Sequence, residues 1–135
     1  ASLLVGEISQ NLSLLRKAID ATPALGAEAI AQHEALRLRV LDLSATLSGD
    51  PTPRKRSIAA TPSINERVSY ALSTSREATA PPTGTQKEQY QFAAAEFEKA
   101  LAELKSLTKD IRALEDVVEK AGGPWTPGRM PEWKK

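Results

Sequence analysis

The feature that most constrains the fold is one long helical pattern over residues 86–121. Thr85 and Glu88 have the spacing of a capping box, in which the hydroxyl and the carboxylate accept hydrogen bonds from amides at a helix start. Residues 122–124 (Gly-Gly-Pro) end the pattern, because glycine adopts the left-handed conformation after a helix and proline cannot continue one. The apolar residues recur in steps of three and four, at Tyr90, Ala93, Phe97, Leu101, Leu104, Leu107, Ile111, Leu114, Val118 and Ala121. A one-sided helix of this length must pack against other helices.

Three further segments have helical spacing. Residues 3–20 place one apolar face at Leu4, Ile8, Leu12, Leu15 and Ile19. Residues 23–48 place another at Ala29, His33, Leu36, Val40, Leu43 and Leu47. A weaker helix over residues 63–79 has its face at Ile64, Val68, Ala71 and Leu72. Thr22 and Pro23 suit the start of the second helix, and Ser63 with Glu66 forms a capping box for the third.

These segments predict an all-α fold, an up-and-down antiparallel four-helix bundle with unequal helices. We expect the bundle to span residues 1–121, with helices over about 3–20, 23–48, 63–79 and 86–121. The longest helix should overhang the others, or the first helix should be cut short where this sequence begins. Residues 122–135 should form an extended tail rich in proline and tryptophan, which docks on the bundle or on a neighbour. A coiled coil is less favoured, because no heptad with charged flanks is sustained.

Composition excludes several classes of site. The net charge of +1 provides no global field that would attract nucleic acid or an anionic membrane, and the absence of cysteine excludes disulfides and thiolate metal sites. No apolar run approaches the roughly 18 residues that span a bilayer. Because the chain begins with Ala1 rather than Met, we expect it to be an excised domain or a processed product.

No pattern of metal ligands or catalytic residues is present. The single histidine, His33, has Ile30 three positions before it and Arg37 four positions after it, so it matches neither the Glu-x-x-His nor the His-Glu-x-x-His metal motif. We predict that it lies at the edge of the bundle interface. The carboxylates of the longest helix alternate with basic residues, which is typical of a solvated face. We therefore predict no catalytic residues, no metal and no cofactor for this chain.

The basic cluster Arg54–Arg56 lies in a proline-rich stretch and has no interleaved aromatic residue on which a base could stack. We therefore interpret it as an exposed loop and predict no nucleic-acid binding. The tail offers more specific side chains. Its candidate interaction residues are Trp125, Arg129, Met130 and Trp133, because exposed tryptophans are costly unless at least one docks. Docking along the chain's own bundle is favoured over docking on a neighbouring domain, and both remain open.

Two stretches, residues 82–90 and 121–131, resemble the C-terminal region of bacterial sortilin-like proteins. These are BNR/Asp-box β-propeller proteins, often labelled as glycosyl hydrolases or exo-sialidase-like. The resemblance is clearest over residues 81–133 and covers the other helices in organisation only. The residues that carry it are Pro82, Thr83, Gly84, Thr85, Gln86, Tyr90, Gly123, Pro124, Pro127, Gly128 and Pro131.

The resemblance implies an accessory module on a large exported protein, located outside the cytoplasm. It transfers no catalysis, because the Asp-box motif Ser-x-Asp-x-Gly-x-x-Trp is absent. We therefore expect a non-catalytic structural or interaction module whose partner is the upstream propeller domain of the same chain or another subunit. One alternative is a free-standing helical adaptor that binds a partner helix. Another is an accessory part of a glycoside hydrolase site. The activity of the parent protein and the oligomeric state stay open.

Overall fold

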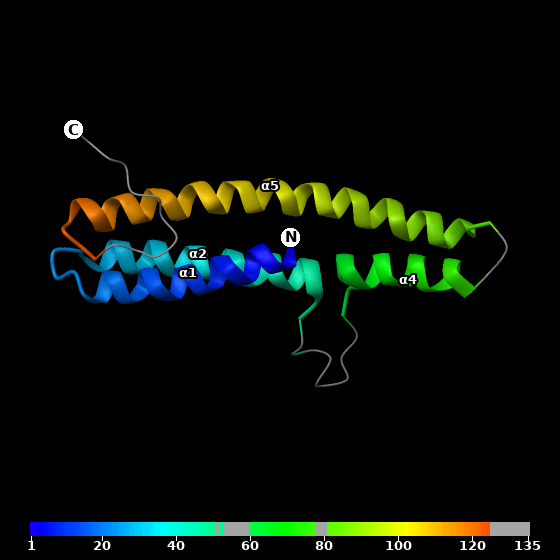
Figure 1. Ribbon diagram of the computed structural model, residues 1–135, viewed down its shortest axis with the longest axis horizontal. Helices are drawn as coiled ribbons and strands as arrows, with labels where there is room; N and C mark the ends of the chain where they lie inside the picture. The colour runs from blue at the N-terminus through cyan, green and yellow to red at the C-terminus, as the bar shows by residue number, and fades with distance from the viewer. Residues whose placement is uncertain (51, 53–59, 78–80, 125–135) are drawn as a thin grey trace. The chain divides into compact units, whose positions relative to one another are not determined.

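The computed structural model describes residues 1–50, 52, 60–77 and 81–124, and the side chains of 74–77 are not described. In this part of the chain every regular element is a helix (Figure 1): α1 (Ser2–Asp20), α2 (Ala27–Ser48), α4 (Ile64–Glu77) and α5 (Gly84–Lys120). The helices contain 19, 22, 14 and 37 residues, respectively. These elements confirm the predicted all-α helical bundle and the unequal lengths of its helices.

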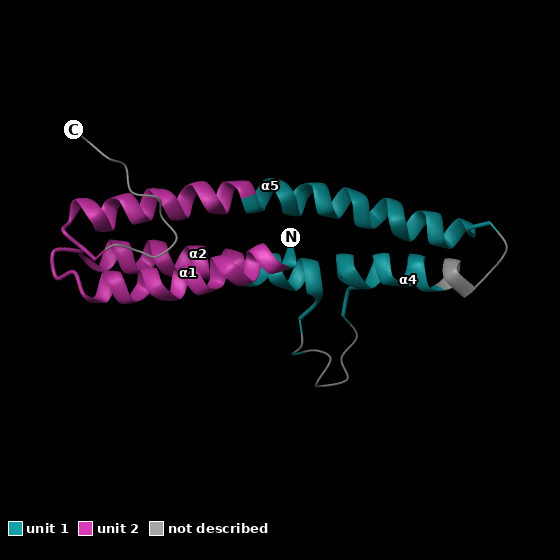
Figure 2. Cartoon of the chain, viewed as in Figure 1, with its two compact units in different colours: residues 1–2, 41–104 teal, residues 3–40, 105–135 magenta. Residues whose placement is uncertain are grey.

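The chain forms two compact units (Figure 2). Unit 1 comprises Ala1–Ser2 and Leu41–Leu104, and unit 2 comprises Leu3–Val40 together with the chain from Lys105 onward. The long helices α2 and α5 contribute to both units. Unit 1 therefore contains the last turns of α2, all of α4 and the first part of α5. Unit 2 contains nearly all of α1, the first part of α2 and the last part of α5.

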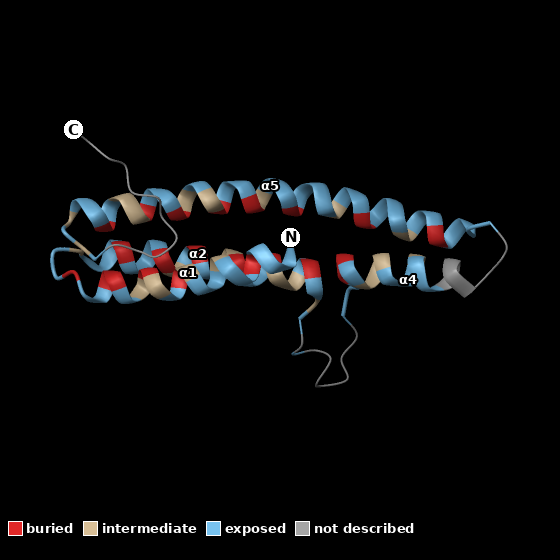
Figure 3. Ribbon diagram, viewed as in Figure 1, coloured by how far each residue is buried: buried red, intermediate tan, exposed pale blue. Residues whose placement is uncertain are grey.

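The core of unit 2 follows the apolar faces that the sequence predicts. Its buried apolar residues are Val5, Leu12, Leu15, Ala18, Ile19, Ala29, Leu36, Val40, Leu107, Ile111, Leu114 and Val118. Figure 3 shows these buried positions facing the interior along each helix. Leu4, predicted to lie on the buried face of α1, is half-exposed instead, because it stands at the first turn of its helix. The close packing of three apolar stripes stabilises this unit.

Polar contacts also join the helices of unit 2. The His33 Nε2 atom lies 2.8 Å from the Leu12 carbonyl oxygen and donates to it, because a carbonyl can only accept. Arg39 on α2 donates to the Asp110 carboxylate on α5 at 2.7 Å and to the Ser106 hydroxyl at 3.1 Å. His33 is buried rather than at the edge of the interface as predicted, because this hydrogen bond draws its ring between α1 and α2.

The junction between α1 and α2 differs from the prediction. The Thr22 hydroxyl does not cap α2; it donates to the Ala18 carbonyl at 2.7 Å and satisfies the last turn of α1. The Leu25 amide then donates to the Thr22 carbonyl at 3.0 Å, which closes a turn. Residues 21–26 therefore form the connection, and the second helix begins at Ala27 rather than at Pro23 as predicted.

The end of α5 follows the Gly-Gly-Pro prediction. Gly122 has a φ of 79°, the left-handed conformation that glycine adopts without a Cβ clash. Its amide donates to the Glu119 carbonyl at 2.9 Å, and the Gly123 amide donates to the Val118 carbonyl at 2.9 Å. These two bonds form a Schellman motif, which satisfies carbonyls that the helix end would otherwise leave without partners.

In unit 1, α4 follows α2 closely in space. Gly49, with a φ of 88°, ends α2 by donating from its amide to the Ala45 carbonyl at 2.8 Å. The predicted capping box then opens α4: the Ser63 amide donates to the Glu66 carboxylate at 2.8 Å, and the Glu66 amide donates to the Ser63 hydroxyl at 3.3 Å. The third helix, predicted over 63–79, is found as Ile64–Glu77, and residues 78–79 lie outside the described part.

The cap of α5 lies two residues earlier than predicted. The Thr83 amide donates to the Gln86 side-chain oxygen at 2.6 Å, and the Gln86 amide faces the Thr83 hydroxyl at 3.4 Å. The capping box is therefore Thr83–Gln86 rather than Thr85–Glu88, and α5 begins at Gly84. The physical reason is burial: the Gln86 side chain lies on the inward face of α5, whereas Thr85 and Glu88 are exposed.

Unit 1 has a smaller core than unit 2. Its buried apolar residues are Leu43, Leu47, Ile64, Ala93, Ala100 and Leu104. Tyr90, Phe97 and Leu101 belong to the predicted buried face of the longest helix, yet they are 61%, 40% and 39% exposed. Leu72 of α4 is also half-exposed. The prediction of burial is wrong at these positions, because no described element of unit 1 covers the side of α5 on which they lie.

Candidate interaction site

An open apolar groove runs between α4 and α5 within unit 1. One part, of about 450 Å³, is lined by Val68, Ala71, Leu72, Pro82 and Tyr90 together with polar side chains of α5. A second part, of about 400 Å³, is lined by Leu47, Ile64, Val68, Tyr90, Ala93 and Phe97 and by the first two residues of the chain. The two parts share Val68 and Tyr90, so they form one continuous surface, which we call the α4–α5 groove.

The groove follows from residue spacing on the two helices. Val68 and Leu72 are four residues apart on α4, and Tyr90 and Phe97 are seven apart on α5, so each pair shares one face of its helix. These side chains supply the walls. Ala93 and Ala94 supply a low floor, because an alanine side chain reaches no further than its Cβ. The groove can therefore accept apolar side chains from another helix.

Arg67 holds α4 against α5. Its guanidinium donates to the Gln89 side-chain oxygen at 2.7 Å, and its Nε atom lies 3.5 Å from the Glu96 carboxylate. The same guanidinium lies 5.7 Å from the centroid of the Phe92 ring. Gln89, Phe92 and Glu96 are spaced by three and four residues and occupy one side of α5. The groove therefore opens on the other side of this helix, where Tyr90 and Phe97 lie.

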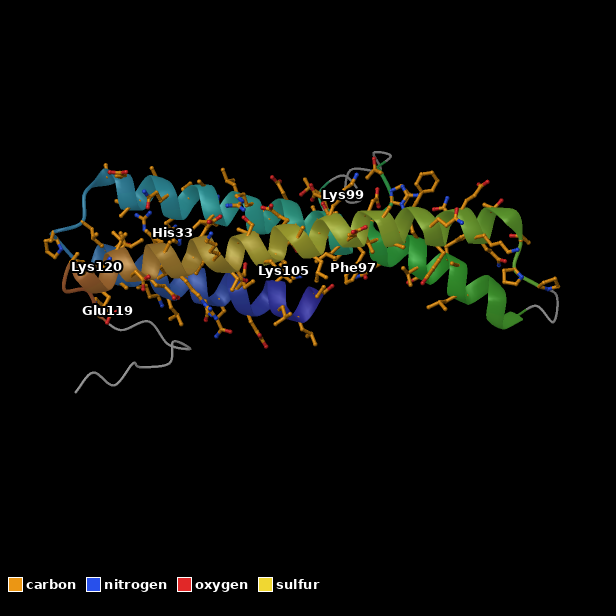
Figure 4. All side chains as sticks on the ribbon, turned by 90° about the horizontal axis from the view of Figure 1, so that it is seen from above. His33, Phe97, Lys99, Lys105, Glu119 and Lys120 are labelled. Atoms are coloured by element: carbon orange, nitrogen blue, oxygen red, sulfur yellow. The ribbon has the colours of Figure 1, made fainter. Side chains whose placement is uncertain are left out.

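Two charged residues of opposite sign, Lys87 and Glu98, lie along the same side of α5, and the first of them lines the groove. Lys87 lines the groove near the start of α5, and Glu98 lies eleven residues further along, only about 20° away around the helix. Both side chains are exposed, and within the described residues neither forms an ion pair. Lys99 lies on the opposite side of α5 from Phe97 (Figure 4). The exposed side of α5 thus carries apolar residues with one basic position inside the groove and one acidic position beyond the residues that line it.

Three carboxylates outside the groove, Glu34, Asp50 and Asp110, are engaged in salt bridges or a turn. Hydrogen bonding to Arg37 lowers the pKa of Glu34, and hydrogen bonding to Arg39 lowers the pKa of Asp110. The backbone amide of Thr52 likewise lowers the pKa of Asp50. A lowered pKa keeps each carboxylate ionised at neutral pH, whereas a general acid requires a raised one. Within the described residues, no three His, Asp or Glu side chains are placed to hold a metal ion.

The residues that carry the family resemblance separate into different parts of the structure. Pro82 and Tyr90 line the groove, while Thr83 and Gln86 cap α5. Gly84 is the first residue of α5, and Thr85 is exposed in its first turn. The other two described residues of the set, Gly123 and Pro124, belong to unit 2. The groove and the cap beside it therefore contain residues of the first stretch, 82–90, and none of the second stretch, 121–131, among the described residues.

The remaining candidate residues lie outside the described part of the chain. They are Trp125, Pro127, Gly128, Arg129, Met130, Pro131 and Trp133, together with the basic cluster Arg54–Arg56. Docking of the tail, on the bundle or on a neighbour, thus stays a prediction.

The sequence pattern predicted that the groove residues are buried in the core, and it did not identify them as an interaction site. Val68, Ala71 and Leu72 were assigned to the inner face of a weak helix, and Tyr90 and Phe97 to the buried stripe of the longest one. One signal was available: a predicted helix of about 35 residues beside one of about 16 must leave part of its apolar stripe without a long partner. The predicted overhang therefore indicated where an exposed apolar surface would occur.

Comparisons of this chain with protein-family models, with curated proteins and with solved structures find no match. Among the described helices, none combines the length and apolar character required to cross a membrane.

Proposed function

We propose that this chain is a non-catalytic interaction module that binds a helical segment in the α4–α5 groove. The observation that carries the proposal is the exposure of Leu72, Tyr90 and Phe97 along one continuous apolar surface. Contiguous apolar surfaces on folded proteins commonly mark interaction sites, whereas single exposed apolar residues do not. A groove between two helices with apolar walls suits the apolar face of a third helix.

The rest of the chain supports a helix as the bound element. In unit 2 the apolar stripe of α5 is buried at Leu107, Ile111 and Leu114, in a unit that also contains α1 and α2. In unit 1 the buried stripe of the same helix continues at Ala93, Ala100 and Leu104. Tyr90, Phe97 and Leu101 lie roughly 60° further around the helix and stay exposed. A further helix along the groove would bury them as the stripe is buried in unit 2. The exposed stripe thus has the form of an incomplete helical bundle.

The described polar groups favour binding over catalysis. Glu34 and Asp110 are held in the ionised form by arginines, and the His33 ring is fixed between helices by the Leu12 carbonyl. None of these three lines the groove. The groove is lined mainly by apolar side chains, which favour surface burial. An accessory role in a glycoside hydrolase site would require carboxylates of the longest helix in a pocket beside the tail, and residues 125–135 of that tail lie outside the described part.

We further propose that the module belongs to a larger exported β-propeller protein. The support is the resemblance of residues 82–90 and 121–131 to the C-terminal region of sortilin-like proteins. An antibody against this domain tests the context through the apparent mass and compartment of the natural protein. A band several times larger than 14.6 kDa in the envelope or secreted fraction is expected. A cytosolic band near 14.6 kDa would instead leave the free-standing helical adaptor as the function.

Site-specific photo-cross-linking tests the binding role. A photoreactive phenylalanine analogue replaces Phe97 in the natural protein in its own cells, and the adducts are mapped to peptides by mass spectrometry. We expect one defined polypeptide segment, and we expect its loss when Tyr90→Glu is added. The matched control places the same group at Val117, which is similarly exposed on α5 but lies in unit 2. An absence of adducts at position 97, or an equal pattern at 117, would contradict the proposal.

A further inference from the structure

We propose that the helix that occupies the α4–α5 groove is supplied by a second copy of this chain, with the two α5 segments paired antiparallel. The inference rests on the proposed function, because it names the occupant of the same groove. It is carried by the arrangement of apolar and charged side chains along the exposed face of α5, which is complementary to itself when one helix is reversed.

The exposed face of α5 has a regular composition. Its positions, in steps of three and four, are Lys87, Tyr90, Ala94, Phe97 and Leu101. All five are exposed, and four of them are apolar or aromatic. This spacing forms the seam along which two helices pack with side chains interleaved. The seam alternates large and small residues, with Tyr90 and Phe97 on either side of Ala94.

Reversal of one helix brings unlike residues together. When Tyr90 of one copy lies opposite Ala94 of the second copy, two-fold symmetry places Ala94 of the first opposite Tyr90 of the second. A large ring then faces a small side chain at both layers. In the same register Lys87 lies opposite Phe97 of the second copy and next to its Glu98. The lysine stem can cover the aromatic ring while its ammonium group reaches the carboxylate.

Charge favours this occupant. The register forms the Lys87–Glu98 pair twice, once on each side of the two-fold axis. A parallel pairing would instead place Lys87 against Lys87 and Glu98 against Glu98. Both side chains are exposed and without an ion pair among the described residues, so each is available to the second copy. α5 itself carries both the apolar seam and the two charges that pair across it when one copy is reversed.

The pairing also uses the other wall of the groove. A helix seated between α4 and α5 covers Val68 and Leu72 as well as Tyr90 and Phe97, because all four line the groove. By symmetry each copy provides the helix that fills the other copy's groove. The product is a four-helix arrangement of two α4 and two α5 segments. It buries the apolar residues that a single copy leaves exposed.

The first test is the oligomeric state of the full 135-residue chain, measured by sedimentation equilibrium over a broad range of protein concentrations. We expect a reversible dimer, and we expect Phe97→Asp to give a monomer whose far-UV circular dichroism is unchanged. Because Phe97 is partly exposed, this substitution does not remove a core residue. A wild-type chain that stays monomeric at every concentration would overturn the proposal.

The second test is an exchange of charges. Lys87→Glu alone places two carboxylates together, and Glu98→Lys alone places two ammonium groups together, so each should weaken the dimer by about tenfold or more. The double variant should dimerise as the wild type does. An equimolar mixture of the two single variants should form the heterodimer, because their charges are again complementary. Lys99→Glu, on the opposite side of α5, is the matched control and should change nothing.

The outcomes of these tests distinguish the proposal that a second copy is the bound partner from the proposal that the groove binds a helix. A dimer whose dissociation constant is unaffected by either single exchange would show that another surface or register is used, and would overturn the inference. A monomeric chain, with cross-links from position 97 to a different polypeptide, would also overturn it but leave the proposed binding function in place. A monomeric chain without such cross-links would overturn both.

Discussion

The two units share one helix but differ in how much of it they bury. In unit 2, Leu107 and Leu114 of α5 are 0% and 3% exposed, whereas in unit 1 Leu101 is 39% exposed and Tyr90 61%. The spacing of apolar residues is the same in both stretches. The difference shows that apolar periodicity identifies which face of a helix can be buried. It does not show whether the same chain provides the residues that bury that face.

The lengths of the other helices explain the difference. Unit 2 has nearly all of the 19-residue α1 and the first part of α2 to pack against α5. Unit 1 has the last turns of α2 and the 14-residue α4, whose outer half contributes the half-exposed Leu72. Fewer apolar side chains therefore meet α5 in unit 1. Two of the three buried apolar positions of α5 in unit 1, Ala93 and Ala100, are small.

The largest expected effect contrasts two leucines of the same helix. Leu107→Ala should destabilise the chain by about 2–5 kcal/mol, because it removes a fully buried side chain and leaves a cavity. Leu101→Ala, six residues earlier in unit 1, should change the free energy of unfolding by less than about 1 kcal/mol. Urea denaturation at low protein concentration measures both. Equal losses would show that the groove is closed in solution and that the contrast between the units fails.

A smaller effect tests the close packing at the end of unit 2. A Cβ atom on Gly123 would lie 2.5 Å from Val118 Cγ1 and 2.6 Å from the Thr22 hydroxyl. Gly123→Ala should therefore destabilise the chain by about 1–3 kcal/mol, since the backbone must move to relieve the overlap. Gly6→Ala in α1 is the control with opposite sign. Nothing lies within 4 Å of a Cβ at Gly6, so helix propensity should stabilise the chain by about 0.5–1 kcal/mol.

Thermal melting followed by circular dichroism measures the effects of the Gly123 and Gly6 substitutions as shifts in melting temperature. Melting temperatures that fall for both variants, or for neither, would contradict the packing assigned to this end of unit 2.

The start of α5 in unit 1 provides a third test. Thr83→Ala should destabilise the chain by about 0.5–2 kcal/mol, because the hydroxyl at the cap is lost. Thr85→Ala should have almost no effect, since Thr85 is exposed beyond the cap. Hydrogen exchange of the first-turn amides of α5 reports the local change. If Thr85→Ala were the more damaging variant, the helix would begin two residues later in solution.

Most of the fold follows from local patterns. The all-α class, the inner face of α2 and the Gly-Gly-Pro stop all follow from spacing and capping rules. The errors occur where two local rules are satisfied together. Both Thr83–Gln86 and Thr85–Glu88 match the capping-box pattern, and only the burial of Gln86 selects the first. Likewise, Thr22 can cap the following helix or end the preceding one, and its bond to Ala18 decides for the second.

The candidate site was less accessible to sequence reasoning, for a physical reason. A groove forms where one helix has apolar side chains that its neighbouring helices do not cover. Whether they are covered depends on which segments pack together in the folded chain. Tyr90 and Phe97 recur in steps of three and four with the buried residues of α5, as Leu107 and Leu114 do, but they lie roughly 100° around the helix from those leucines. Only the packing of α4, held by Arg67 at the far side of α5, leaves the first pair exposed. The unequal lengths of the helices were the one usable signal.

The smallest expected effect concerns the ion pair that joins α2 to α5 in unit 2. Hydrogen bonding to Arg39 lowers the pKa of Asp110 below its ordinary value of 3.8. A carboxyl whose pKa is lower in the folded chain contributes stability above its unfolded pKa, and that contribution is lost as the pH falls through the folded value. Asp110→Asn should therefore lower stability slightly at neutral pH and reduce the loss of stability below about pH 4.

Urea denaturation of the wild type, Asp110→Asn, Arg39→Gln and the double variant, measured between neutral and acidic pH, tests this linkage. Glu34 and Asp50 also have lowered pKa values, so some acid destabilisation should persist in every variant. The wild type and Asp110→Asn should converge in acid, because the wild-type carboxylate becomes neutral there. Curves that stay parallel at every pH would show that Asp110 does not pair with Arg39 in solution.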